Sequence, residues 1–209
     1  MAQQPPYRRQ VLDHLGLVAG MFEALGLGEI INQATQQNPE MRLVTAGHAV
    51  NAMVLNGLGF VNQQLYLVPR FFQNTPTSRL ITPGITAEPP NDDALGRALE
   101  TLYAYGGTEL YSLTAATAAE RLGLAPTFAQ LDRTSFHVDG RYNSDEAPEA
   151  HVIHIARGYS RDPRPDLNQM MLALIVEHQA AIPLLMKPLS GNSREAQAFG
   201  EVIRQHIQQ

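Results

Sequence analysis

A carboxylate in the middle of a predicted strand is the feature of this sequence with the clearest chemistry. Residues 128–142 have the pattern of one β-strand, and Asp132 lies inside it. Strand interiors disfavour Asp, and a carboxylate held there is costly unless something binds it. Metal-dependent enzymes that act on nucleic acids need a rigidly held carboxylate, because it fixes a divalent ion against a phosphate. Asp132 is therefore a candidate catalytic residue and metal ligand; an ordinary strand Asp bound by backbone amides is the alternative.

Basic side chains downstream of this strand could contact DNA phosphates. The candidates are Arg157, Arg161, Arg164 and Lys187. Three of them fall in a proline-containing loop, and Lys187 falls in a predicted strand. The alternative is a solvated loop, since Asp162 and Asp166 cancel much of its charge.

Histidines near the strand offer a weaker metal-site hypothesis. His151 and His154 are three residues apart, and His137 and Asp139 follow Asp132. On a strand, residues three apart point to opposite faces, so this spacing does not converge on one ion. The Val-Ile pair between His151 and His154 favours a strand, and Asp139-Gly140 is a turn signal. We therefore expect structural histidines here.

Composition narrows the class of protein. The chain has 209 residues, of which 44% are hydrophobic, and it contains no cysteine, so disulfides and thiolate metal sites are excluded. No apolar run reaches the roughly 18 residues that a membrane span needs. The basic pair near the N-terminus lacks the apolar segment of a secretory signal. We expect a globular cytoplasmic protein that does not enter a membrane.

Net charge argues against strong independent DNA binding. Residues 1–125 carry 7 Arg and 10 acidic residues, and residues 126–209 carry 8 Lys or Arg and 10 acidic residues. Neither part is basic, although neutralised phosphates supply most of the affinity of DNA-binding proteins. A local basic stripe remains compatible with these numbers.

The elements that must position these side chains fall into two parts. Residues 1–125 have helical spacing, with helices expected around residues 15–25, 29–37, 45–58, 91–105 and 108–122. Thr45 and either Asn91 or Asp92 are predicted N-caps. Residues 66–72 form a short aromatic segment interrupted by Pro69, and residues 75–90 are proline-rich and predict an extended connector. The stripe expected to be buried in the third helix consists of Ala49, Val50, Met53, Val54 and Leu58.

The second part, residues 126–209, changes to the period of strands. After the strand around Asp132, residues 151–156 predict a short strand, and residues 167–177 and 182–189 predict a β-hairpin. A helix over residues 194–208 follows, with Ala198, Phe199, Val202 and Ile203 expected on its buried side. The fold class is therefore α+β: a helical N-terminal domain, then a strand, a β-hairpin and a helix. The next strand would lie beside the first, since a crossover helix returns the chain to the same sheet.

Several ordered motifs resemble bacterial insertion-sequence transposases of the DDE class. The resemblance covers about residues 10–209. In the second part it is carried by Leu131-Asp-Arg-Thr-Ser-Phe-His137, by residues 158–169, and by residues 182–193. In the first part it is carried by residues 12–21, by Asn56-Gly-Leu-Gly-Phe60, by residues 65–72 and by residues 91–99.

The resemblance implies the first part of a ribonuclease-H-like catalytic domain. In that fold two Asp and one Glu bind two divalent ions, Mg²⁺ or Mn²⁺, for attack on a phosphodiester. Asp132 matches the first acid, and the second and third are expected beyond residue 209. One carboxylate does not hold two ions about 3.5–4 Å apart. We therefore expect an incomplete ribonuclease-H-like unit, a truncated transposase-like protein without strand cleavage of its own.

Other functions stay open at this point. The chain could be a regulatory module that binds transposon ends or joins full-length transposase and inhibits transposition. It could also be one half of a split transposase completed by a second chain, or a homo-oligomer. The helix over residues 45–58 could be a DNA reader of the helix-turn-helix type. It carries neither Arg nor Lys, which favours a packed or dimerisation module.

Overall fold

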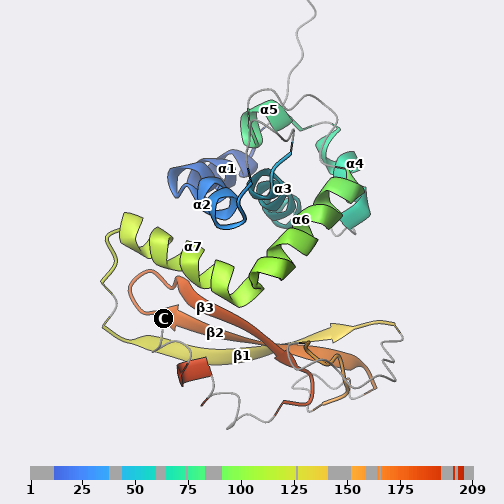
Figure 1. The fold of residues 1–209 in the computed structure, drawn as a ribbon, viewed down its shortest axis with the longest axis vertical. Coiled ribbons are helices and arrows are strands. Elements are labelled where there is room, and N and C mark those ends of the chain that lie inside the picture. Colours follow the sequence, from blue (N-terminus) through green and yellow to red (C-terminus); the bar gives the residue numbers. More distant parts are fainter. Residues whose placement is uncertain are drawn as a thin grey trace, which may run out of the picture. The chain divides into compact units, whose positions relative to one another are not determined.

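The computed structural model describes residues 12–37, 44–59, 65–73, 75–82, 91–125, 127–140, 152–158, 164, 166–193, 200 and 202–204. They divide into two compact units, Met1–Leu110 and Tyr111–Gln209. Figure 1 shows helices in the first unit and a sheet in the second. The chain is thus α+β, with the helices first, as the sequence predicts.

The helical elements follow one another closely along the first part of the chain. They are α1 (Leu15–Ala24), α2 (Leu27–Ala34), α3 (Ala46–Leu58), the 3-10 turn η1 (Leu65–Leu67), α4 (Val68–Phe72), α5 (Thr77–Leu80), α6 (Asp92–Tyr105) and α7 (Gly107–Arg121). The boundary between the two units falls inside α7. Among the described residues no single helix is long and apolar enough to cross a membrane, while α1 and α2 together, bent by 54°, have a suitable length and composition.

Two predicted N-caps are confirmed. The hydroxyl of Thr45 accepts the backbone N–H of His48 at 3.2 Å, and Nδ1 of His48 accepts that of Thr45 at 3.4 Å. This reciprocal capping box satisfies two backbone donors that the first turn of α3 leaves free. At α6, the side-chain oxygen of Asn91 accepts the N–H of Ala94 at 2.9 Å. Of the two candidates for that cap, Asn91 is the residue used.

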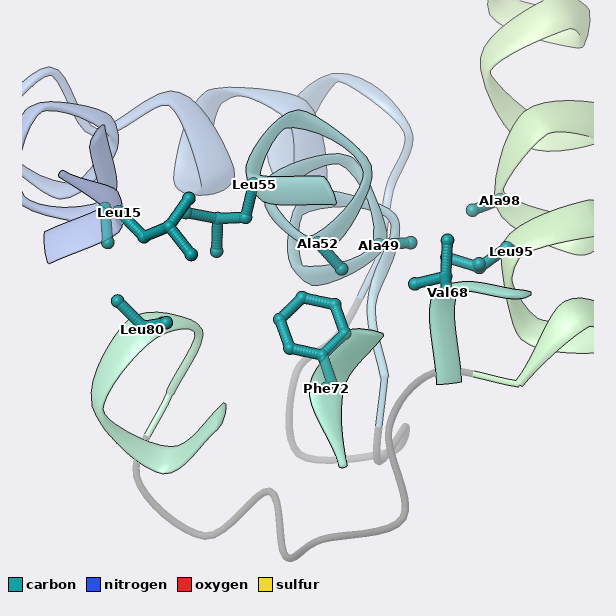
Figure 2. Packing of buried hydrophobic residues seen from close by; sticks show 10 residues of the cluster. Leu15, Ala49, Ala52, Leu55, Val68, Phe72, Leu80, Leu95 and Ala98 are labelled. Atoms are coloured by element: carbon teal, nitrogen blue, oxygen red, sulfur yellow. The ribbon is translucent and has the colours of Figure 1, made fainter. Parts of the chain in front are cut away.

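The stripe predicted for α3 is confirmed in part, since Ala49 is fully enclosed and Val50, Met53 and Val54 are half-buried. Leu58 is 48% exposed, whereas Ala49, Ala52 and Leu55 are fully enclosed. Figure 2 shows Phe72 pointing toward Ala52 in this core. Small residues on α3 let its neighbours approach closely, so the face that carries alanine is the face that packs. The predicted stripe therefore includes Leu58, which is exposed, and omits Ala52 and Leu55, which are enclosed.

Two segments predicted to be irregular are short helices instead. Pro69 lies in the first turn of α4, where its missing N–H breaks no intrahelical hydrogen bond. Helix α5 interrupts the predicted connector and buries Thr77 and Leu80. Residues 83–90 of that connector lie outside the described residues. The buried ends of α4 and α5 explain why these segments are helical despite their prolines.

The described residues of the second unit form a sheet of three strands in the order β1-β2-β3, namely Ala129–Val138, Asn168–Glu177 and Pro183–Ser190. Both pairs are antiparallel, and all ten residues of β1 are paired with β2. The predicted strand and hairpin are therefore confirmed. The short strand predicted over residues 151–156 is wrong for its described residues, which make only an isolated bridge between Ala156 and Gln169. From Met170 onward, β3 already occupies that edge of β2.

One face of the sheet is buried and the other is half-buried. Ala173, Ile175 and Leu185 pack on one side with Val202, which is fully enclosed. The predicted burial of Val202 is confirmed, whereas the predicted burial of Ile203 is wrong, because its side chain is 45% exposed. Phe199 lies outside the described residues. Ala198 lies outside the described residues. Leu172 and Leu174 belong to the opposite, half-buried face.

A buried acid organises the turn between β2 and β3. The carboxylate of Glu177 accepts the backbone N–H groups of Gln179 at 2.5 Å, Ala180 at 2.7 Å and Ile182 at 3.0 Å. The bond from Ile182, followed by those from Gln179 and Ala180, holds the pKa of Glu177 below its ordinary value of 4.5, against the opposing effect of burial. The ionised side chain thus replaces water as the partner of these donors.

We predict that Glu177→Gln lowers the thermal unfolding midpoint at about pH 7 and flattens its pH dependence. A lowered folded-state pKa adds stability that is fully present above pH 4.5, and this stability is lost as the pH falls through the lowered value. Circular dichroism melts between about pH 7 and about pH 3 measure the effect. Glu120→Gln on the exposed side of α7 is the control. Equal midpoints for the two variants at every pH would contradict the assignment.

Close backbone contact fixes the end of the sheet at Gly191. A Cβ there would collide with the carbonyl oxygens of Gln169 and Ala156. We predict that Gly191→Ala destabilises the protein by about 1–3 kcal/mol, the range for overpacked sites. Gly96→Ala in α6, where a Cβ has nothing within 4 Å, should instead stabilise by roughly 1 kcal/mol because alanine is the better helix former. Urea unfolding of both variants measures these changes in the free energy of unfolding. An unchanged free energy for Gly191→Ala would contradict the prediction.

Candidate functional site

Asp132 lies in the middle of β1 with its side chain exposed. It is paired with Leu174 of β2, which is paired in turn with Met186 of β3. Because paired residues of neighbouring strands share a face, these three side chains lie on the same, half-buried face of the sheet. Oδ1 of Asp132 accepts the backbone N–H of Arg133 at 2.7 Å. The residues paired with Asp132 are therefore apolar, and its carboxylate is hydrogen-bonded to the backbone of its own strand.

Two basic residues of the sheet lie on the face opposite Asp132. Arg133 is paired with Ala173, and Ala173 with Lys187, so both basic side chains belong to the face opposite Asp132. Lys187 is half-buried there. The structure therefore does not bring Lys187 together with Asp132.

Charged groups cluster at the end of the sheet where β2 begins. Nε and Nη2 of Arg164 donate to Oδ1 and Oδ2 of Asp166 at 3.0 and 2.9 Å, and the two side chains are 54% and 61% exposed. This bond, helped by the charges of Asp166 and Asp139, raises the pKa of Arg164. The same bond, with smaller help from the charge of Arg157, lowers the pKa of Asp166. Arg157 and Arg164 thus lie near carboxylates. Arg161 lies outside the described residues.

Histidines do not assemble a metal site in the described part of the chain. His154 donates its backbone N–H to the hydroxyl of Ser190 at 2.9 Å, which ties residues 152–158 to the end of β3. His137 is paired with Gln169 and shares the face opposite Asp132. His151 lies outside the described residues. Within them, no group of three or more His, Cys, Asp or Glu is placed to hold a metal ion.

The described residues do not by themselves fit the divalent ions that the transposase resemblance implies. Mg²⁺ is usually held by one or two carboxylates together with substrate phosphates, and a two-metal site needs acids on both sides of the ions. Asp132 supplies one carboxylate, and the residues paired across from it are Leu174 and Met186. A two-metal site at Asp132 would therefore need further carboxylates from residues other than these.

Sequence reasoning missed two polar groups that the structure makes prominent. Glu177 looked like the polar end of a strand, but it is 1% exposed and closes the hairpin. Asn51 lies on the enclosed side of α3, where its Nδ2 donates to the carbonyl of Leu80 at 3.0 Å. Local sequence gives no signal for Asn51, because the partner that its buried amide needs lies 29 residues away.

Asp132 is expected to reduce the stability of the sheet. We predict that Asp132→Thr raises the free energy of unfolding by up to about 1 kcal/mol, since threonine suits a strand better than aspartate. Urea unfolding measures this, with Thr134→Ser, the same face two residues on, as the control. A lower stability of Asp132→Thr would mean that the carboxylate has a structural role.

Comparison with known proteins places the helical part of the chain in a family. A family model described as a domain of unknown function, DUF4277, matches residues 7–116, which is 110 of the 209 residues. No curated protein and no solved structure matches the sequence significantly. The match spans α1 to α6 and ends inside α7. This chain therefore belongs to the family defined by the domain of unknown function DUF4277.

Proposed function

We propose that this protein is related to DNA transposition and that β1 carries one acid of a DDE-type catalytic site. The order and pairing of the strands support this proposal. An antiparallel β1-β2-β3 meander with a carboxylate in the middle of its first strand, followed by the helical residues 202–204, matches the opening of a ribonuclease-H-like domain. A protein with this task would act in the cytoplasm, where bacterial DNA is accessible.

The position of Asp132 is the observation that carries the proposal. Its carboxylate is exposed in the middle of a ten-residue strand, where aspartate is disfavoured. Its described neighbours across the sheet, Leu174 and Met186, are apolar and supply no cation. A rigid, exposed carboxylate is what a divalent ion and a phosphate require.

The remaining acids of such a site are not found beside Asp132 among the described residues. In the described part of the chain no cluster of acids accompanies Asp132. We infer that the chain alone does not cleave DNA with Mg²⁺ or Mn²⁺. Arg157, Arg161 and Arg164 are proposed to contact phosphates of the transposon end. This contribution would be weak and salt-sensitive, because Arg164 is already paired with Asp166.

The edges of the sheet favour a second candidate function, in which another chain joins this one. Among the described residues β1 is an edge strand, and it contains neither proline nor glycine. The other edge strand, β3, carries Pro183 and Pro188, which interrupt the donors that a neighbouring strand would use. An unprotected edge accepts a strand from another chain. The protein would then be half of a split transposase, or an inhibitor that associates with full-length transposase.

We predict that the purified chain gives no nicking of supercoiled plasmid with Mg²⁺ or Mn²⁺ above that of Asp132→Ala, because one carboxylate does not hold both ions. Agarose gels of relaxed and supercoiled DNA measure this. Asp139→Ala, at the end of the same strand, is the matched control. Cleavage lost in Asp132→Ala and kept in Asp139→Ala would show that these residues contain a complete site.

The second candidate is tested separately by mixing the chain with a full-length transposase of the resembled class. Lower transposition in a mating-out assay supports an inhibitor. New cleavage that needs both Asp132 and a fragment carrying the later acids supports a split enzyme. Neither effect, together with no binding between the chains in sedimentation experiments, excludes both.

A further inference from the structure

Strand β1 lies along one edge of the three-stranded sheet (Figure 1). All ten of its residues are paired with β2, so the strand keeps one register over its full length. Among the described residues no strand pairs with its outer side. Every second residue of a strand directs its N–H and C=O groups to the same side, and a neighbouring strand would satisfy this whole outer row.

Two hydrogen bonds identify the residues of β1 that form the outer row. Glu177, the partner of Ala129 in β2, donates its N–H toward β3, to the carbonyl of Ile182 at 3.0 Å. Ala129 and Glu177 are therefore a non-hydrogen-bonded pair, and the backbone groups of Ala129 point outward. The N–H of Arg133 fits this alternation, because it donates to Oδ1 of Asp132 at 2.7 Å. The odd-numbered residues of β1 thus face the edge.

Strand β1 lacks the features that usually keep an edge strand from pairing. It contains neither proline nor glycine, and its pairing with β2 has no bulge. The opposite edge strand, β3, carries Pro183 and Pro188. The charged residues of β1 are Asp132 and Arg133, and its Phe136 is 48% exposed. An edge of this length and composition is suited to accepting another strand.

The sequence of β1 fits a second copy of itself in one register. In a two-fold antiparallel pair, opposed side chains share a face, so each register is centred on a residue. Within β1 the two longest registers are centred on Arg133 and on Thr134. The first opposes Arg133 to its own copy, and like charges directly opposite are destabilising. The second places Asp132 opposite Phe136. Arg133 then lies opposite Ser135, so like charges are not opposed, and this self-complementarity favours a second copy as the occupant.

We propose that two copies of this chain associate through β1, antiparallel and centred on Thr134, so that their sheets join into one. The two outer rows exchange about eight backbone hydrogen bonds over residues 130–138. Phe136 lies diagonal to Thr134 of the second copy, within reach of an aromatic ring.

The proposed dimer does not depend on the role in transposition. Its two Asp132 carboxylates lie about 14 Å apart, because four residues along the strand and one strand spacing separate them. Ions of a two-metal site are only about 3.5–4 Å apart, so dimerisation does not complete such a site. The dimer instead covers the edge that a strand from another protein would use.

The absence of cysteine from the chain makes the register directly testable. Thr134→Cys places two thiols in the central, non-hydrogen-bonded pair, where Cα atoms about 4.5 Å apart allow a disulfide. Mild oxidation at about 100 μM chain should link most of this variant into dimers. Gln130→Cys, exposed on the same face, is the matched control, because residue 130 lies opposite Val138 of the second copy. Asp132→Cys and Phe136→Cys should cross-link when mixed, and neither should do so alone.

Sedimentation equilibrium measures the association without a cross-link. Ser135→Pro removes an outer N–H, and edge strands tolerate proline there, so the variant should keep its circular dichroism spectrum. Its dimer dissociation constant should rise at least about tenfold, whereas Ser135→Ala, which keeps the N–H, should dimerise as the original chain does. If the proline variant does not fold, the cysteine variants decide alone.

Three results would overturn the proposal. The first is a chain that stays monomeric at about 100 μM, which would leave the edge to a strand of another protein. The second is equal cross-linking of Thr134→Cys and Gln130→Cys, which would indicate pairing without a fixed register. The third is a folded Ser135→Pro variant that dimerises as tightly as Ser135→Ala.

Discussion

The antiparallel pairing of β1 with β2 decides where every side chain of the sheet points. It runs without interruption from Ala129 opposite Glu177 to Val138 opposite Asn168. Because successive side chains alternate between faces, a slip by one residue would exchange the two faces. Asp132 would then lie against Ala173 and Val202, and burial of an unpaired carboxylate is strongly unfavourable. The hydrophobic face thus selects the register, and the register places the acid outside.

The hairpin from β2 to β3 depends on a second electrostatic constraint. Its turn exposes several N–H groups at once, and the carboxylate of Glu177 collects three of them. The register shift between Ile175 and Val176 lies directly before this turn. A buried anion surrounded by backbone donors is stable because each lone pair that loses water gains a hydrogen bond. The two acids of the sheet therefore differ. Glu177 is enclosed and hydrogen-bonded, whereas Asp132 is exposed to solvent.

The helical unit follows a different rule, in which small residues bring helices together. Ala49 and Ala52 let α3 sit at the centre of the unit, in contact with α1, α2, α4 and α6. Val68 and Leu95 meet on one side of this helix, as Figure 2 shows. An enclosed α3 without Arg or Lys is suited to holding the unit together, and less suited to entering a DNA groove.

The sequence by itself determined the order of the elements and most of the local chemistry. The caps at Thr45 and Asn91, the strand around Asp132 and the hairpin after it depend on neighbours a few residues away, so their signals are visible in the chain. The sequence also identified Asp132 as the carboxylate of interest. Its site could be predicted only in part, because the other positions depend on pairing between distant segments.

Only the tertiary structure decided which faces are covered. It placed Lys187 on the face opposite Asp132, and it enclosed Ala52 and Leu55 of α3 while it left Leu58 exposed. It also enclosed the side chain of Glu177, the last residue of β2. These outcomes follow from strand register and close packing, which join residues far apart in the chain and leave little trace in local sequence patterns.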